Sequence, residues 1–383
     1  MNFKLKDLGP QLITVIAVVL IFGFFTYNAQ INMENRGIDF GYGFLSQESS
    51  FDVQFSLIEY DGSHSYFRAY LVGLLNTILV SVIGIIIATI IGVIVGVARL
   101  SPNFLINKFA AYYVEFFRNI PLLLQIFFWY FAALRALPLP QDAEPIFGVF
   151  FLTIKGLFVP AFIWENLNIF FYSILAALIA IIVIRIQAKK LRETKGKQIP
   201  VFLISIGLIF ILPLLSFLIG GVSLSFEIPQ LKQLAATSFV YDGGLSLPPE
   251  LIALTLSLSL YTATFIAECV RAGIQGVGKG QKEAAASIGL TPNQVLKLVI
   301  MPQALRIIIP PTTNQYLNLT KNSSLAAAIA YPDLVLVFAG TALMQTGKAI
   351  EIVSITMFTY LSLSISISIL MNWYNKKIAI QEK

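Results

Sequence analysis

Four ionisable side chains interrupt long apolar stretches of the sequence, namely Glu115, Arg118, Glu268 and Lys321. A charge at the centre of a bilayer costs about 2.5–3.5 kcal/mol or more, so such residues usually face a cavity or a partner. The two carboxylates and two cations could bind a charged solute. Alternatively, Glu115, Arg118, Glu268 and the nearby Arg271 could pair with one another near the ends of their helices. Both interpretations remain open at this point.

Lys321 belongs to a polar helical face. Asn314, Asn318 and Lys321 are spaced by four and three residues, which places them on the same side of a helix. We expect this face to line a solute pathway or to contact a partner protein. The full set of pathway candidates consists of polar residues in the same apolar stretches: Gln125, Tyr261, Asn314, Asn318, Lys321, Asn322 and Ser323.

The composition indicates a polytopic membrane protein. Of the 383 residues, 57% are hydrophobic and only 12% are charged, whereas a soluble domain is about 25% charged. These values exclude an ordinary soluble globule and a disordered chain. With one Cys and one His, the chain has no disulfide framework and no classical zinc or haem ligand set. We therefore expect no metal or cofactor in this chain.

The apolar segments predict an all-α integral membrane protein with about eight transmembrane helices, since a span needs roughly 20 apolar residues. A shorter apolar segment, 146–163, contains Lys155, Gly156 and Pro160, and we expect it to be re-entrant or interfacial. The predicted spans are 11–28, 70–98, 111–137, 169–187, 200–220, 249–270, 313–340 and 347–374.

Lys and Arg residues predict the orientation of these spans. If the N-terminus is cytoplasmic, eighteen of them fall in cytoplasmic segments and five in outer ones, and cytoplasmic loops carry the excess of positive charge. Both termini are therefore expected in the cytoplasm. Anionic membrane lipid accounts for the net charge of +6, so no nucleic-acid partner is needed.

The longest cytoplasmic loop, 271–306, contains clear helix-end signals. Gly289 suits the left-handed position that ends a helix. Thr291, Pro292 and Gln294 fit the N-cap, N1 and N3 positions of a capping box. We expect two short helices joined by a sharp bend, the second interrupted at Pro302. Such a pair could insert into a groove of a partner, or it could be a simple connector.

A near-match to the P-loop lies in the same region. Gly273 and Gly278-Lys279 have the required spacing, but Gly280 replaces the Ser or Thr that would bind magnesium. A membrane span also precedes the motif where a strand is needed. We therefore expect any ATP to be handled by another subunit.

This loop resembles the EAA signature of ATP-binding-cassette (ABC) importer permeases. The signature is present as Glu283-Ala284-Ala285, Gly289, Val299 and Met301-Pro302, with Val and Met in place of Ile and Leu. In that family the loop docks in a cleft of a cytoplasmic ATPase. The resemblance implies that the coupling residues, none of them catalytic, are Glu283, Ala284, Ala285, Gly289 and Pro302.

Other segments resemble the polar-amino-acid subfamily of these permeases, and the resemblance covers about 69–137 and 239–374. The matching residues are Gly73, Thr77 and Ser81, and the segments 113–125, 260–274 and 320–325. The extra N-terminal span and the inserted pair at 169–220 are similar to the eight-span permease of general L-amino-acid importers.

The resemblance implies a type I permease core of five helices, with an extra N-terminal helix and an inserted helix pair. It also implies a second permease chain in a heterodimer, ATPase subunits that hold ATP and Mg²⁺, a periplasmic amino-acid-binding protein and a bacterial inner membrane. A zwitterionic substrate would then meet Lys321 or Arg118 with its carboxylate and Glu115 or Glu268 with its ammonium group.

The expected organisation follows from these matches. Segment 1–68 is an anchor and periplasmic segment, and 69–374 is the permease domain. Segment 138–238 is an insertion that interrupts it, and 271–306 is the coupling loop.

Three other functions remain in competition. An ion-coupled secondary transporter would favour inverted repeats and broken helices, which the sequence does not display. A scaffold or channel would not need the polar face around Lys321. An ABC permease for a sugar, ion or peptide would share the loop and differ only in the subfamily segments.

Overall fold

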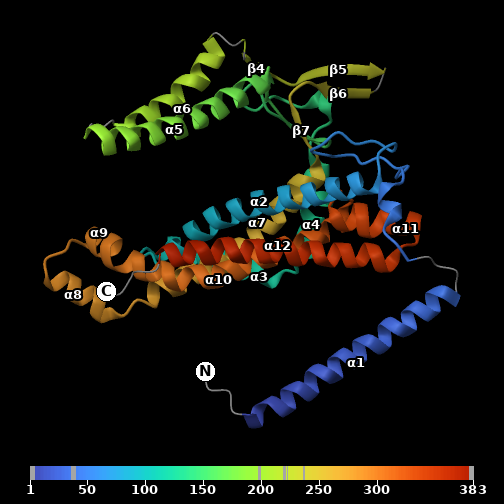
Figure 1. Cartoon of the computed structure of the whole chain (residues 1–383), viewed down its shortest axis with the longest axis horizontal. Coiled ribbons are helices and arrows are strands. Elements are labelled where there is room, and N and C mark those ends of the chain that lie inside the picture. Colours follow the sequence, from blue (N-terminus) through green and yellow to red (C-terminus); the bar gives the residue numbers. More distant parts are fainter. Residues whose placement is uncertain are drawn as a thin grey trace. The chain divides into compact units, whose positions relative to one another are not determined.

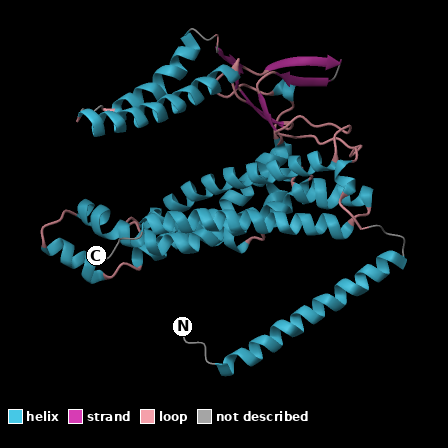
Figure 2. Cartoon of the chain, viewed as in Figure 1, coloured by secondary structure: helices cyan, strands magenta, loops and turns pink. Residues whose placement is uncertain are grey.

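The computed structural model describes residues 5–35, 40–196, 200–218, 221, 223–235 and 238–378. Four cations of the orientation argument, Lys4, Arg36, Lys197 and Lys383, lie outside these residues. The chain divides into two compact units, one of Met1–Phe127 with Leu254–Lys383 and the other of Phe128–Ala253. All seven strands of the described chain fall in the second unit, and the first is helical (Figure 2).

Six helices of the described chain are long and apolar enough to cross a membrane. A bent helix pair makes a seventh candidate, and α6 (Val201–Leu218) is a shorter apolar helix. This set agrees with the prediction of a helical protein with about eight spans. The six long spans are α1 (Leu5–Asn35), α2 (Tyr66–Ala98), α5 (Leu167–Lys195), α7 (Pro249–Gln275), the continuous helical stretch Pro292–Ile329 and α12 (Ala349–Ile378).

The bent pair is formed by α3 (Phe104–Asn119) and the helical stretch Leu122–Ala136, which begins with α4 (Leu122–Phe127). The helical direction changes by 101° at the break before Pro121, whose ring cannot donate a backbone hydrogen bond. Gln125 replaces the missing donors, because its Nε2 donates to the carbonyls of Phe117 at 2.8 Å and Ile120 at 2.9 Å. The buried amide therefore stabilises the bend.

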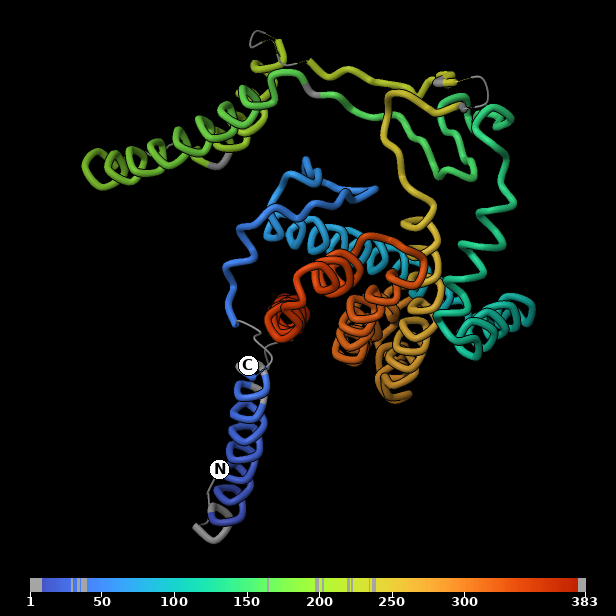
Figure 3. Tube along the Cα trace, turned by 90° about the vertical axis from the view of Figure 1, so that its right-hand side faces the viewer, coloured from blue at the N-terminus to red at the C-terminus, as the bar shows by residue number. Residues whose placement is uncertain are grey.

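Small residues allow α2 to pack closely against α7 in the first unit (Figure 3). A Cβ atom on Gly92 would lie 2.7 Å from Ile266, and one on Gly96 would lie 2.8 Å from Val270. The Gly92-x-x-x-Gly96 spacing, which allows two helices to approach closely, thus serves helix packing.

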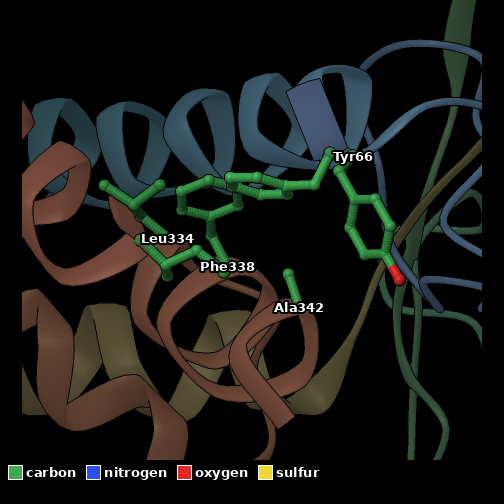
Figure 4. Packing of buried hydrophobic residues seen from close by; sticks show 6 residues of the cluster. Tyr66, Leu334, Phe338 and Ala342 are labelled. Carbon is green, nitrogen blue, oxygen red and sulfur yellow. The ribbon is translucent and has the colours of Figure 1, made fainter. Parts of the chain in front are cut away.

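An ordered loop packs on the helix ends of the same unit. Phe44, in the short helix η1 (Gly43–Ser46), lies in a buried cluster with Tyr66, Leu334 and Phe338 (Figure 4). The backbone N–H of Gly41 donates to Oε1 of Glu351 at 2.9 Å. These contacts tie the segment after α1 to α12.

The predicted span 313–340 differs from the observed helix. The helix α10 runs over Met301–Asn322, continues as the 3₁₀ helix η6 (Ser323–Ile329) and ends at Ala330, which has a left-handed conformation with φ 60°. A π-helix, η7 (Val335–Ala342), and α11 (Leu343–Thr346) follow. The polar residues of α10 lower the hydropathy of its first half. The apolar stretch in the sequence therefore predicts a span that begins after the observed start of the helix.

The second unit contains the α5–α6 hairpin and antiparallel strands (Figure 2). The strand pairs are β3 (Ala161–Glu165) with β4 (Ser223–Glu227), and β5 (Gln230–Ala235) with β6 (Ser238–Asp242). A three-stranded sheet has the order β1 (Phe151–Thr153), β2 (Gly156–Val159) and β7 (Leu245–Leu247).

Segment 146–163, expected to be re-entrant or interfacial, contains β1, β2 and the first residues of β3. Ile154 and Lys155 form the turn between β1 and β2, and Gly156, the first residue of β2, pairs with Thr153 and has φ 124°. A side chain is strained at that φ, and a Cβ would clash with the carbonyl oxygen of Leu247. The glycine therefore allows the β1–β2 hairpin to approach β7 closely.

Candidate functional site: the α8–η5 helix pair and the polar face of α10

A helix pair extends beyond one end of the helices in the first unit (Figure 1). It consists of α8 (Lys279–Ser287), followed by the single turn α9 (Pro292–Gln294) and the π-helix η5 (Val295–Ile300). Ala285 on α8 is buried, as are Val295 and Ile300 on η5. The loop 271–306 is thus a folded element with its own small apolar contact.

Gly289 ends α8 in the way the sequence predicts. Its φ is +84°. The N–H of Leu290 donates to Ala285 O at 3.3 Å, and that of Gly289 donates to Ala286 O at 3.0 Å. These two bonds form a Schellman motif, in which the left-handed residue satisfies the last carbonyls of the helix. The chain direction after α8 is therefore set by the glycine.

Thr291 and Gln294 form the predicted capping box. Oε1 of Gln294 accepts from the backbone N–H of Thr291 at 2.9 Å and lies 3.0 Å from its Oγ1. Because Gly289 and Thr291 are only two residues apart, the bend between the two helices is fixed on both sides.

The expectation that Pro302 interrupts a second short helix is wrong. Helix continues from Pro292 through Pro302 to the end of α10, since η5 and α10 are contiguous. The π-helical turn of η5 immediately precedes the proline, and such turns accommodate the lost hydrogen bond and the bulk of the ring. The second arm of the pair is therefore continuous with the long helix that carries Lys321.

The outer surface of the pair combines charged and apolar side chains. Glu283 and Ala284 are exposed, as the resemblance to a docking loop requires. Ile288 is 78% exposed and Leu298 is 64% exposed. Neither residue is among the coupling residues expected from the sequence, although Ile288 directly precedes the helix-ending glycine. An exposed apolar side chain beside a rigid bend is suited to insertion into a partner's groove.

The polar face of α10 is present as predicted. Asn314, Asn318 and Lys321 are all exposed along one side of the helix. Lys321 lies in its last turn. In a hydrocarbon environment these groups would lack hydrogen-bonding partners, so a water-filled pathway or a second protein must cover them.

The other pathway candidates lie in different surroundings. Tyr261 and Asn322 are half-buried, and the ring of Tyr261 lies against Phe265 with centroids 5.1 Å apart. Gln125 and Ser323 are buried. Ser323 donates to the carbonyl of Thr320 at 2.7 Å, and Gln125 supports the α3–α4 bend. The structure does not bring these two to the exposed face of α10.

A polar cavity of about 520 Å³ opens between α2, α3 and α7. Charged side chains of both signs line it, although sequence spacing alone does not indicate that they meet. The lining residues are Arg99, Val114, Glu115, Arg118, Asn119, Phe265 and Glu268. Its volume lies within the roughly 300–1,000 Å³ of pockets that bind small molecules.

Comparison with known proteins identifies the class. Residues 197–380 match the family described as "Binding-protein-dependent transport system inner membrane component". YhdX of Escherichia coli is 48% identical over 377 residues, which cover 97% of this chain and 94% of YhdX. The chain belongs to this family of ABC transporter permeases, and it is a transport component rather than an enzyme.

Two further relatives match along nearly their whole length. The general L-amino acid transport system permease protein AapQ of Rhizobium johnstonii is 46% identical, over 99% of this chain and 94% of AapQ. The glutamate/glutamine/aspartate/asparagine transport system permease protein BztB of Rhodobacter capsulatus is 38% identical, over 99% of this chain and 95% of BztB. Both alignments therefore also run through segment 138–238.

Proposed function

We propose that this chain is a permease subunit of a bacterial ABC importer for L-amino acids, in the inner membrane with both termini in the cytoplasm. The observation that carries the proposal is the rigid helix pair of α8 and η5. It presents Glu283, Ala284 and Ile288 to a partner and is continuous with α10 and its polar face. The substrate class is supported by the named substrates of AapQ and BztB.

The proposed partners follow from the same surfaces. A cytoplasmic ATPase, which holds ATP and Mg²⁺, receives the α8–η5 pair in a groove. A second permease chain completes the pathway opposite Asn314, Asn318 and Lys321. A periplasmic amino-acid-binding protein delivers the substrate.

Coupling in this arrangement is mechanical. When the ATPases close, they displace α8, and the Schellman motif at Gly289 and the capping box at Thr291 transmit the displacement to η5. Because η5 continues into α10, movement of the pair reorients the helix that carries Lys321. A ligand-driven or nucleotide-driven shift of this kind requires a stiff connection, which these hydrogen bonds supply.

The first test is to purify the tagged chain from its native membrane in a gentle detergent and identify what accompanies it by mass spectrometry. We expect a P-loop ATPase and a second permease. Reconstituted in proteoliposomes with the binding protein, the complex should take up ¹⁴C-labelled L-amino acids only when ATP is present. A chain that purifies alone and moves solute without ATP would support a secondary transporter instead.

Docking is tested separately with Glu283→Lys. The charge lies on the exposed side of α8, so the folded chain should insert normally while ATP hydrolysis is no longer coupled to uptake. Glu193→Lys, on the exposed end of α5, makes the same change of net charge away from α8 and should leave coupling intact. Wild-type uptake by Glu283→Lys would remove Glu283 from the docking surface.

A further inference from the structure

The charged side chains that line the cavity between α2, α3 and α7 differ in whether they are paired within the chain. Glu268 is already neutralised within the chain: its Oε2 accepts from Nε of Arg271 at 3.0 Å and from Nη2 at 2.9 Å. Its Oε1 pairs with Arg99. Arg271 also donates to Gln275 at 2.8 Å. With both oxygens engaged, Glu268 is a structural link between helix ends and has no free oxygen for a solute.

Glu115 and Arg118 lie on the opposite wall of the cavity, on α3. Both are exposed. Among the described residues, neither makes an ion pair or a hydrogen bond. They are three residues apart, so their side chains leave the same face of the helix roughly 5–6 Å apart at the Cβ atoms. The cavity therefore holds one carboxylate and one guanidinium whose bonding capacity is unused.

The guanidinium of Arg118 is oriented by an aromatic ring. Its central carbon lies 4.8 Å from the centroid of Phe265 on α7. A guanidinium in contact with a ring face keeps its N–H groups free along its edge, where they match the two oxygens of a carboxylate. Phe265 thus leaves Arg118 able to bind a carboxylate in the bidentate mode.

We propose that Glu115 and Arg118 form a subsite for the amino-acid backbone in transit, in which Glu115 binds the α-ammonium and Arg118 binds the α-carboxylate. This inference rests on the proposed function and adds the contacts with the substrate. Both groups belong to every L-amino acid, so the subsite recognises the backbone and leaves the side chain to the remaining cavity. We therefore expect it to accept many amino acids with similar affinity.

The test uses the purified permease–ATPase complex without the binding protein, so that only the membrane subunits bind. The probe is a ¹⁴C-labelled mixture of L-amino acids, measured by scintillation proximity. Glu115→Gln and Arg118→Gln should each weaken binding by about tenfold or more, the value of one charge-assisted hydrogen bond or bidentate pair. L-Alanine should compete with the probe, whereas ethylamine and propionate, which each lack one charge, should not.

Two matched variants separate recognition from folding. Lys108→Gln removes a charge from the same helix, where Lys108 lies over Phe104 outside the cavity, and should leave binding unchanged. The exchange Glu115→Arg with Arg118→Glu keeps both charges and should recover part of the affinity, because the zwitterion can bind in reverse.

The outcomes distinguish this inference from the proposed function. If wild-type complex imports amino acids but Glu115→Gln and Arg118→Gln bind the probe normally, the subsite is wrong and the proposed function stands. If these variants lose the second permease during purification, the two side chains belong to a subunit interface and the subsite is also wrong. If the wild-type complex transports only another class of solute, the proposed function itself fails.

Discussion

Glu268 and Arg271 lie one turn apart on α7, and a single carboxylate oxygen of Glu268 accepts two hydrogen bonds from the guanidinium, at 3.0 and 2.9 Å. The other oxygen pairs with Arg99, the C-cap of α2. One carboxylate therefore joins the ends of two helices that also pack through Gly92 and Gly96. Its role is to hold these helix ends together, beside a cavity whose other charged wall remains free.

Glu268→Gln should lower the stability of the folded chain. The substitution removes the carboxylate that pairs with both Arg99 and Arg271, and a buried polar group that loses its partner costs about 1–3 kcal/mol. Thermal unfolding of the detergent-purified protein, followed by tryptophan fluorescence, measures the loss. Glu193→Gln on the exposed end of α5 should have no effect. Equal melting temperatures for both variants would contradict the structural role of Glu268.

Gly92→Leu should disrupt the contact between α2 and α7. Even a Cβ would lie 2.7 Å from Ile266, so the helices must separate, and overpacking of this kind costs about 1–3 kcal/mol. Gly207→Leu in α6 provides the control, since its nearest neighbour is 3.8 Å away. The yield of monodisperse protein and its melting temperature should fall for Gly92→Leu alone. A normal melting temperature would show that α2 and α7 are not held at this distance.

Gly289→Val should uncouple ATP hydrolysis from uptake. Valine is strained at the φ of +84° that ends α8, and the left-handed conformation costs an L-residue roughly 1–2 kcal/mol. The bend between α8 and η5 would then change without loss of the transmembrane helices. ATPase and uptake rates in proteoliposomes measure the coupling ratio. Gly280→Val, where a side chain meets open space, should retain it; a coupling ratio that is normal in both variants would refute a role for the bend.

Much of the structure of loop 271–306 could be predicted from the sequence because its determinants are local. A glycine in a left-handed position and a threonine three residues before a glutamine each specify one helix end. The polar face of α10 could also be predicted from the sequence, since helical spacing alone aligns Asn314, Asn318 and Lys321. The Gly92 and Gly96 contact required only the knowledge that small residues permit close approach.

Other features depended on contacts between distant segments. The strand of Ala161–Glu165 pairs with Ser223–Glu227, and the whole α5–α6 hairpin separates them, so the apolar run alone did not indicate a strand. The π-helical turn before Pro302 has no local sequence signal. The division of the charged residues into a paired Glu268 and an unpaired Glu115 required atomic distances, because both residues have the same chemistry and similar apolar neighbours.

Lys321→Ala should reduce uptake far more than it reduces insertion. Lys321 is exposed at the end of α10, on the face that also carries Asn314 and Asn318, and its ammonium is the only charge on that face among the three. Removing it eliminates an electrostatic contact with a substrate carboxylate or with the facing subunit, which should lower the uptake rate by about tenfold. The control is Lys376→Ala at the exposed end of α12, which removes the same charge from a position outside that face. Initial uptake rates, normalised to the amount of complex in the proteoliposomes, compare the two. Lys321→Arg should restore part of the activity if charge is what the position supplies, and normal transport kinetics in Lys321→Ala would exclude Lys321 from the pathway.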